Sequence, residues 1–481
     1  MKRKLTTMAV LLATMVMQAQ TARQFTINLT DDGQANMVCF LADHPTGRAI
    51  VGVPGGGYSM LSNTHEGTQA HEWLNKQGIS YFVVNYRLPK GDRTIPIGDV
   101  EHGIRTVRDS AKVWHINPSD VGIMGFSAGG HLSSVISTLS DFDARPNFSI
   151  LFYPVISMDV KKSHRWSCIN FLGEEGHKNG NLIHKYSTNN AVQRHLTPPA
   201  IIITASDDGL VNPVTNGLEY YKAMHDAGNE CAYYSYPSGD HGFGFGHWFK
   251  YHDQMLNDLG KWLDSHPSPK ADAIKVACIG NSITDGHGIP FAPANGYPAQ
   301  LQKLLGKDYL VKNFGVSGRT MLNKGDQPYM NEMAWKDAVA FKPDVVIIKL
   351  GTNDSKPQNW QYGEEFKQDL KQMITTLRPD LAQPVKKGKK NKKQVIKNEG
   401  PKIILCTPIP ALKTSWGIND SIITNNIIPI QQQVAQEYNL QVIDLHSLFG
   451  DGKDTMLGDG IHPNGKGAQK MAQIIADAIK L

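Results

Sequence analysis

Cysteine is scarce in this sequence, with five residues among 481. A set that is small, odd in number and widely spaced excludes a fold held together by a disulfide framework. The hydrophobic fraction of 40% and the charged fraction of 19% exclude a disordered or fibrous chain. At roughly 100–200 residues per domain, the length predicts two or three globular domains.

A true excess of positive charge is also lacking, although the formal net charge is +5. Lys2, Arg3 and Lys4 lie in a segment that we expect to be removed, and six more lysines crowd into residues 386–393. The remainder of the chain is therefore mildly acidic, and we expect no nucleic-acid partner. The lysine-rich run is typical of a solvated loop.

Motifs for cofactors and metals are missing as well. The glycines form neither G-x-G-x-x-G nor a phosphate-binding loop. No pair of histidines has metal-ligand spacing with a third ligand nearby. We therefore expect an activity that depends on the chain's own side chains, with no cofactor and no metal.

The longest apolar stretch near the N-terminus, residues 8–17, follows a basic start and precedes small and polar residues. This three-part layout is typical of a secretory signal peptide, here over residues 1–22. The stretch is too short to cross about 30 Å of hydrocarbon, and no later segment has the ~18 apolar residues of a membrane span. We expect a soluble protein that is exported to the periplasm or secreted after cleavage.

Short β-branched runs alternate with longer amphipathic stretches along the rest of the chain. This alternation predicts βαβ units, mostly parallel sheets and the α/β fold class. Two prolines and small residues near residue 270 are typical of a linker. We expect a first domain over 23–266, a linker over 267–272 and a second domain over 273–481. The predicted strands are 49–53, 81–85, 121–124, 149–153, 200–204 and 232–236, then 274–279, 309–313, 344–350, 402–407 and 441–445.

A serine follows the third predicted strand of the first domain. The segment Gly125-Phe126-Ser127-Ala128-Gly129 fits G-x-S-x-G between a strand and a helix, which is the setting of a nucleophile elbow. Such a turn holds the serine in a strained backbone conformation that exposes its Oγ, and the flanking glycines avoid clashes. We expect Ser127 to be a nucleophile.

Partners for this serine follow in the chain order Ser–Asp–His. His241 lies in a loop after a predicted strand and can take the serine proton as a base. Two acids, Asp207 and Asp208, end an earlier strand, and the residue pattern leaves open which of them orients the histidine. The glycine run 55–57 ends the first strong strand, where backbone N–H groups can approach an oxyanion closely.

Together these residues resemble the α/β-hydrolase esterases, and closely the carbohydrate and feruloyl esterases with a glycine-rich oxyanion loop. The similarity covers about residues 25–265. It implies an α/β-hydrolase domain with Ser127 as nucleophile and His241 as base, and the family spacing D-x-x-V implies Asp208 as the acid. The oxyanion amides of the family correspond to Gly56, Gly57 and Ala128.

Four short segments mark a second candidate site in the second domain, and three of them follow predicted strands. They are residues 280–284, 313–318, 351–354 and 459–464. Parallel-sheet enzymes place their sites beyond the carboxyl ends of strands. The amide of Ser282, an amide of Gly318 and the side-chain amide of Asn353 can form an oxyanion hole with three donors. Asp459 and His462 are three residues apart, so one loop can supply both the acid and the base.

This pattern resembles the SGNH, or GDSL-like, hydrolases over roughly residues 273–481, which implies a flavodoxin-like domain. Asn281 departs from the Gly-Asp-Ser of the family, since an amide keeps the hydrogen bonds of the turn but loses a charge. His287 and Asp354 have no role assigned by the resemblance, and we interpret them as a surface residue and a loop brace. The residues that name the family correspond to Ser282, Gly318, Asn353 and His462.

Two different serine esterase patterns therefore lie on one chain. The resemblances imply a bifunctional carbohydrate esterase that removes acetyl groups, or acetyl and feruloyl groups, from a plant hemicellulose such as xylan at two acyl-enzyme sites. In one alternative, a domain is inactive or acts as a carbohydrate-binding module. In another, the first domain is a serine peptidase. We expect an acylated polysaccharide or oligosaccharide as the substrate.

Overall fold

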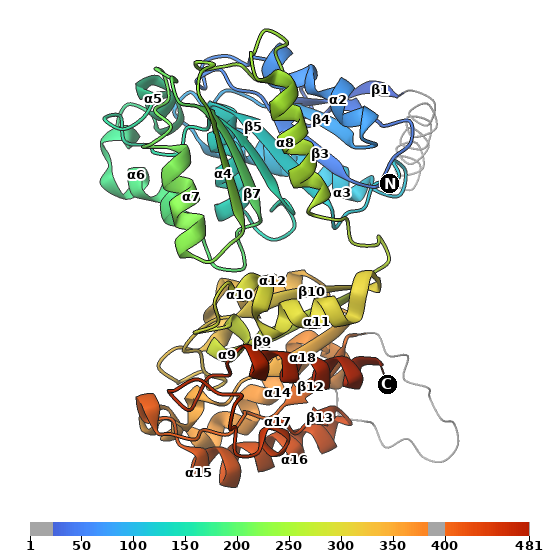
Figure 1. Ribbon diagram of the computed structural model, residues 1–481, viewed down its shortest axis with the longest axis vertical. Coiled ribbons are helices and arrows are strands. Elements are labelled where there is room, and N and C mark those ends of the chain that lie inside the picture. The colour runs from blue at the N-terminus through green and yellow to red at the C-terminus, as the bar shows by residue number, and fades with distance from the viewer. Residues whose placement is uncertain (1–22, 383–399, 481) are drawn as a thin grey trace, which may run out of the picture. The chain divides into compact units, whose positions relative to one another are not determined.

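The computed structural model describes residues 23–382 and 400–480 (Figure 1). The predicted signal peptide over 1–22 and the lysine-rich run over 386–393 lie outside the described residues. The chain divides into two compact units, of which one ends at Ala271 and the other begins at Asp272. Each unit has its own sheet and its own hydrophobic core.

The first unit is built on an eight-stranded sheet with the order β1-β2-β4-β3-β5-β6-β7-β8. β2 pairs antiparallel with β1 and β4, and the other pairs are parallel. The six strands predicted here are present, whereas the hairpin β1–β2 is an addition to them. The strands are β1 (Gln24–Asn28), β2 (Asn36–Phe40), β3 (Ala49–Val53), β4 (Ser80–Asn85), β5 (Val121–Phe126), β6 (Ser149–Phe152), β7 (Ala200–Ala205) and β8 (Cys231–Tyr236).

Helices cover both faces of this sheet. Apolar residues of α3 and α4, such as Ile104 and Leu132, pack in one core cluster, and those of α2 and α8, such as Leu74 and Leu259, pack in another. β5 is buried along its whole length, as expected for a central parallel strand covered on both sides. The helices include η1 (Thr64–Thr68), α2 (Ala70–Lys76), α3 (Thr94–Asp109), α4 (Ala128–Leu139), α5 (Arg165–Leu172), α6 (Gly180–Tyr186), α7 (Gly217–Asp226) and α8 (His252–Asp264).

The second unit has a five-stranded, fully parallel sheet with the order β10-β9-β11-β12-β13. All five predicted strands are present. The strands are β9 (Ile274–Gly280), β10 (Tyr309–Gly315), β11 (Val345–Lys349), β12 (Lys402–Cys406) and β13 (Gln441–Ile443).

Apolar residues of α11 and α18, such as Leu301 and Met471, pack in the core cluster of this sheet. A second pair of helices in this unit, α14 and α16, pack against each other. The helices include α9 (Ser282–Asp285), α10 (Ala292–Asn295), α11 (Tyr297–Leu305), α12 (Met333–Ala340), η6 (Asn353–Ser355), α13 (Pro357–Trp360), α14 (Phe366–Leu377), α15 (Asp420–Ile422), α16 (Ile428–Tyr438), α17 (Leu445–Phe449) and α18 (Gly465–Lys480).

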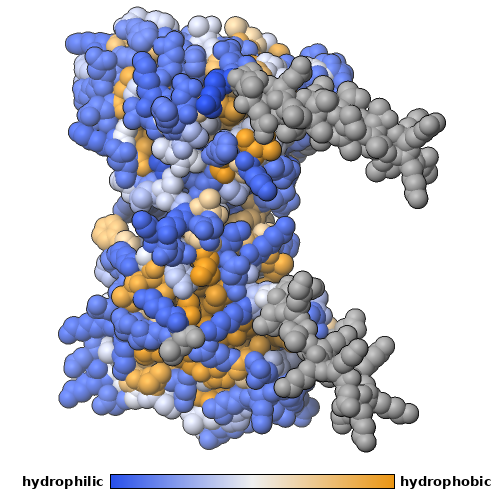
Figure 2. All heavy atoms as spheres, turned by 90° about the vertical axis from the view of Figure 1, so that its right-hand side faces the viewer, coloured by the Kyte–Doolittle hydropathy of each residue, from blue (hydrophilic) through white to orange (hydrophobic). Residues whose placement is uncertain are grey.

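Both units therefore confirm the predicted α/β fold class. Hydrophilic side chains cover most of the face seen in Figure 2, and groups of hydrophobic side chains show between them. Over residues 23–382 and 400–480, no helix combines the length and the apolar character that crossing a membrane requires. All five cysteines are free thiols, and four of them are buried. Packing rather than disulfide bonding therefore stabilises both units.

Candidate active sites

The first candidate site is built around a sharp turn at Ser127. β5 ends at Phe126 and α4 begins at Ala128, so Ser127 alone makes the turn, at φ 52° and ψ −118°. A positive φ is uncommon for a residue with a side chain and stores backbone strain. The turn also requires Gly129, because a Cβ there would lie 2.2 Å from the carbonyl oxygen of Val53. The turn has the geometry of the predicted nucleophile elbow.

A chain of hydrogen bonds links this serine to a histidine and an acid. His241 Nε2 lies 2.8 Å from Ser127 Oγ, and His241 Nδ1 lies 2.7 Å from Asp208 Oδ2. The Asp208 side chain is fully buried, and its Oδ1 accepts hydrogen bonds from the amides of Leu210 and Val211 at 3.0 and 2.8 Å. These bonds fix the carboxylate, so that its second oxygen faces the imidazole.

The structure also separates the two competing acids. Asp207 is exposed, and its Oδ1 accepts a hydrogen bond from the amide of Asp240 at 2.8 Å. This bond lowers the pKa of Asp207. Asp207 therefore braces the loop that carries His241, while Asp208 contacts the histidine itself.

The glycine run after β3 forms a loop beside the elbow. Gly56 has φ 119°, and a Cβ there would lie 2.2 Å from the carbonyl oxygen of Met60, so the loop requires glycine at this position. Among the described residues, none accepts a hydrogen bond from the amide of Gly56 or Gly57. Ala128 is the first residue of α4, where helix amides lack an internal partner. These three amides are available to bind an oxyanion.

A buried histidine supports this loop. His131 Nε2 lies 2.8 Å from the carbonyl oxygen of Tyr186, and its Nδ1 lies 2.7 Å from the hydroxyl of Tyr58, the residue after Gly57. A carbonyl oxygen only accepts, so Nε2 carries the proton and Nδ1 accepts from Tyr58. Burial lowers the pKa of His131 to about 4. These contacts make His131 a structural residue.

His131 is expected to make the first unit sensitive to acid. Between pH 6.5 and about 4 the unfolded state binds a proton at His131 that the folded state does not. The free energy of unfolding therefore falls with acidification over this window, by at most about 1.4 kcal/mol per pH unit from this group. His131→Gln keeps one donor and one acceptor without titrating. Thermal unfolding should show the variant gaining stability relative to the wild type from pH 6.5 to 4, and a constant difference would contradict this.

A buried carboxylate that no motif indicated lies behind the first site. Glu66, in η1, is almost fully buried. A Cβ on Gly55 would lie 2.4 Å from Glu66 Oε2 and 3.1 Å from Ser127 Cβ, so the carboxylate lies beside both the glycine loop and the elbow. Burial raises the pKa of Glu66, against the opposing effects of the Tyr153 hydroxyl and His241. Its position comes from tertiary packing of a short helical turn, for which the sequence has no local signal.

The second candidate site repeats the same hydrogen-bond chain in a different fold. His462 Nε2 lies 2.8 Å from Ser282 Oγ, and His462 Nδ1 lies 2.9 Å from Asp459 Oδ2. Asp459 Oδ1 accepts hydrogen bonds from the amides of Ile461 and His462 at 2.8 and 2.9 Å. One turn of the chain thus positions the acid and the base, as the spacing predicts.

The predicted oxyanion donors of this site follow three neighbouring strands. Ser282 begins α9 after β9, Gly318 follows β10 with φ 83°, and Asn353 begins η6 after β11. Asn353 Nδ2 donates to the carbonyl oxygen of Arg319 at 3.1 Å, which uses one of the two N–H groups of the amide. Asn281 Oδ1 accepts from the amide of Ile283, so the asparagine keeps the turn that an aspartate would hold.

The two residues without an assigned role behave differently. Asp354 is fully buried and accepts hydrogen bonds from the amides of Met321 and Leu322, which confirms a loop brace. His287 is exposed as expected, but its ring centroid lies 4.5 Å from that of His462. Its contact with the active-site histidine was not evident from the sequence, because a lone histidine in a loop carries no motif.

Burial and nearby charges together set the proton affinity of His462. Burial is the largest cause that lowers the pKa of His462, while Asp459 raises it and His287 and Lys349 lower it further. Lys349 is itself buried, which lowers the pKa of its amine to about 7. The net result is a pKa of His462 below its ordinary value, so this base stays neutral at a more acidic pH than a free histidine.

His287→Ala is expected to shift the acidic limb of kcat/KM at the second site toward higher pH. The variant removes the coulombic effect of His287, which lowers the pKa of His462, and it uncovers His462; both changes raise the pKa of His462. The profile would be measured with Ser127 replaced by alanine, so that the first site is silent. His287→Gln serves as the control that removes charge with less loss of cover. An unchanged limb in both variants would contradict the prediction.

Two family profiles match the chain. The profile described as BD-FAE matches residues 42–219, and the GDSL-like Lipase/Acylhydrolase family matches residues 278–470. These ranges contain both serines, Ser127 and Ser282. The matches confirm the resemblance to two different hydrolase families, one in each half of the chain.

Known proteins named as an acetylxylan esterase, a xylanase and a bifunctional hydrolase are similar to this chain. It is 72% identical over 480 residues to an acetylxylan esterase of Xylanibacter ruminicola, with 100% of each chain covered. It is 29% identical over 208 residues to the endo-1,4-beta-xylanase B of Butyrivibrio fibrisolvens, covering 40% of this chain and 31% of that protein. A solved acetyl ester-xyloside bifunctional hydrolase from Caldicellulosiruptor lactoaceticus is 30% identical, with a TM-score of 0.47, covering 51% of this chain and 97% of that one.

The protein is a carboxylic ester hydrolase with an α/β-hydrolase esterase region followed by a GDSL-like domain. Its two serine-centred sites agree with this class, since each has a serine hydroxyl hydrogen-bonded to a histidine, the pair that serine hydrolases use as nucleophile and base. By its full-length identity, the chain belongs to the acetylxylan esterase family of the Xylanibacter ruminicola protein.

Proposed function

We propose that the protein removes O-acetyl groups from xylan or a similar hemicellulose at two separate acyl-enzyme sites. The observation that carries this proposal is the pair of complete hydrogen-bond chains, each with 2.8 Å between a serine Oγ and a histidine Nε2. The choice of acetylated xylan is supported by the full-length similarity to a protein named acetylxylan esterase.

At the first site, Ser127 Oγ attacks the acyl carbon while His241 Nε2 takes its proton. Asp208 holds the imidazole with its proton on Nδ1 and stabilises the imidazolium. The histidine then returns the proton to the sugar oxygen that leaves, and water releases acetate from the acyl-serine by the same steps. The amides that stabilise the oxyanion are those of Gly56, Gly57 and Ala128.

At the second site, Ser282 is the nucleophile, His462 is the base and Asp459 orients the base. Its oxyanion hole uses the remaining N–H of a side-chain amide, which makes it chemically different from the all-backbone hole of the first site. Because the two oxyanion holes and the residues around them differ, the two sites suit acyl groups at different positions of one acylated polysaccharide. The oxyanion donors are Ser282, Gly318 and Asn353.

Further parts of the proposal concern organisation and location. Two esterase domains over 23–266 and 273–481, joined by a linker over 267–272, are supported by the division of the chain near Ala271. Export to the periplasm or beyond the cell is supported by the signal-peptide pattern over 1–22. Feruloyl release is supported by the resemblance of the glycine-rich oxyanion loop to that of feruloyl esterases.

The test uses the full chain with acetylated and with feruloylated xylan fragments, and it follows the released acid by NMR. We expect acetate release by the wild type and none by the double variant Ser127→Ala, Ser282→Ala. Release of ferulate from the feruloylated fragments would support a feruloyl esterase activity beside acetyl release, and its absence would contradict that activity. Hydrolysis of a small aryl acetate without acetate release from any xylan fragment would overturn the proposed substrate, but not the esterase chemistry.

A further inference from the structure

An exposed tryptophan lies beside the second site. Trp416 is 58% exposed, yet its ring centroid lies 5.5 Å from that of His462 and 6.4 Å from that of His287. The ring planes are inclined by 69° to His462 and by 89° to His287. A large apolar surface is therefore presented to solvent next to the group that would deliver a proton to the departing sugar.

The backbone of Trp416 is held in an unfavourable conformation. Its φ of 56° and ψ of 21° lie in the left-handed region, which a bulky aromatic residue rarely adopts. Such strain persists only where surrounding contacts impose it, and it concentrates at functional sites. Ser415 Oγ donates to the carbonyl oxygen of Asp459 at 2.8 Å, and the amide of Leu412 donates to that of Gly460 at 2.8 Å. The loop is therefore bonded to the same turn that carries the acid and the base.

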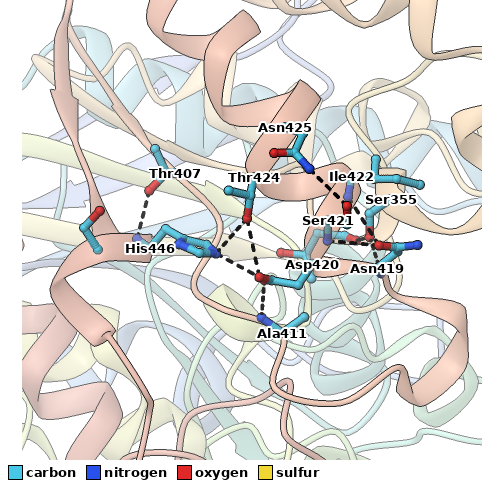
Figure 3. Close-up of polar contacts among 12 residues, drawn as sticks. Ser355, Thr407, Ala411, Asn419, Asp420, Ser421, Ile422, Thr424, Asn425 and His446 are labelled. Carbon is cyan, nitrogen blue, oxygen red and sulfur yellow. Dashed lines mark hydrogen bonds and ion pairs between the residues drawn. The ribbon is translucent and has the colours of Figure 1, made fainter.

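The base of this loop, residues 411–420, is fixed by a polar cluster (Figure 3). Asp420 Oδ1 accepts from the amide of Ala411 at 2.7 Å and lies 3.1 Å from His446 Nε2. These contacts close the two ends of the loop on each other and tie them to α17. The amide of Asn419 donates to Ser355 Oγ at 3.0 Å, which ties the loop to η6, the helix that begins with Asn353.

We propose that Trp416 is a sugar-binding platform, on which a pyranose ring of the acylated saccharide stacks while its ester lies at Ser282. One face of a pyranose ring is lined by C–H groups and packs flat on an aromatic ring, whose faces are electron-rich. A rigid loop suits this role, because an ordered binding surface loses little entropy when the ligand binds. The inference rests on the proposed function, since a small ester without a sugar has nothing to place on the indole.

The experiment compares Trp416→Ala and Trp416→Phe with Ser127 replaced by alanine, so that only the second site reports. For acetylated xylo-oligosaccharides, we expect Trp416→Ala to lower kcat/KM on the order of tenfold, mainly through KM, and Trp416→Phe to recover part of it. For 4-nitrophenyl acetate, which has no sugar ring to stack on the indole, both variants should lose much less kcat/KM than for the oligosaccharide when both substrates are compared on the pH plateau. Trp166→Ala, which removes a tryptophan of similar exposure (59%) from the first unit, is the matched control and should change neither substrate.

A direct binding measurement separates this inference from the proposed function. The inactive double variant Ser127→Ala, Ser282→Ala would be titrated with xylo-oligosaccharide by calorimetry, with and without Trp416→Ala. Weaker binding without the tryptophan supports the platform even if no acetate is released from that sugar. The platform is overturned if binding is unchanged, or if Trp416→Ala slows 4-nitrophenyl acetate as much as the oligosaccharide, because the loop would then only support Asp459.

Discussion

Ser127→Ala is expected to lower turnover at one ester-hydrolysing site on the order of 10⁶-fold and to leave the other site at its wild-type rate, and Ser282→Ala is expected to do the reverse. Each serine Oγ is hydrogen-bonded to its own histidine, His241 in one case and His462 in the other. Without the hydroxyl no acyl-enzyme forms, and the histidine has no proton to take. The loss should therefore be in kcat.

The number of reactive serines can be measured separately from the rate. A serine-directed phosphonate followed by intact mass spectrometry should add two groups to the wild type, one to each single variant and none to the double variant. Ser206→Ala, which changes an exposed serine of the first unit, is the control and should still gain two phosphonate groups. A single adduct on the wild type would show that one of the domains is not a serine esterase.

Asp208→Asn is expected to lower kcat at the first site on the order of 10⁴-fold, because it removes the carboxylate that sets the tautomer of the histidine and stabilises its charge. Asp208 Oδ2 lies 2.7 Å from His241 Nδ1 and is held there by two backbone amides. An asparagine at this position presents either an amide N–H or a neutral oxygen to Nδ1. Neither holds an imidazolium as a carboxylate does.

Asp207→Asn is the matched comparison one residue away. Its side chain would still offer an oxygen to the amide of Asp240, so we expect kcat near normal and a loss of stability of at most about 1 kcal/mol. Both variants would be assayed with Ser282 replaced by alanine. A large loss of kcat in Asp207→Asn, with Asp208→Asn near the parent, would reverse the assignment of the acid.

Much of the fold follows from local sequence, and the exceptions have physical causes. Strands such as β5 and β7 are continuous apolar runs because both faces are covered, and such runs are visible in the sequence. β1 alternates between exposed and half-buried residues at the edge of the sheet. Only two of its residues, Phe25 and Ile27, pack against the core, so its apolar signal is weak and the sequence pattern did not predict it.

The residues of the candidate sites likewise separate into those that local sequence predicts and those that it does not. Ser127 and Ser282 were predicted because the turns that present them need particular residues at fixed spacing. Glu66 and Trp416 were not, because each reaches its site from a segment far from the serine in sequence. His287, five residues after Ser282, was not predicted because a lone histidine in a loop carries no motif. Asn281 departs from its family pattern, and its side-chain nitrogen is buried without a hydrogen-bond partner in the described part of the chain.

The two units assemble their acid and base in different ways, which bears on how each can be remodelled. Asp208 and His241 come from separate loops after β7 and β8, so either loop can be lengthened or exchanged, provided that the hydrogen bond between the two loops, from the Asp240 amide to Asp207, is kept. Asp459 and His462 share one turn and move as a single piece. Loop grafting at the first site can therefore proceed one partner at a time, whereas at the second site a change in that turn displaces both partners from Ser282 together.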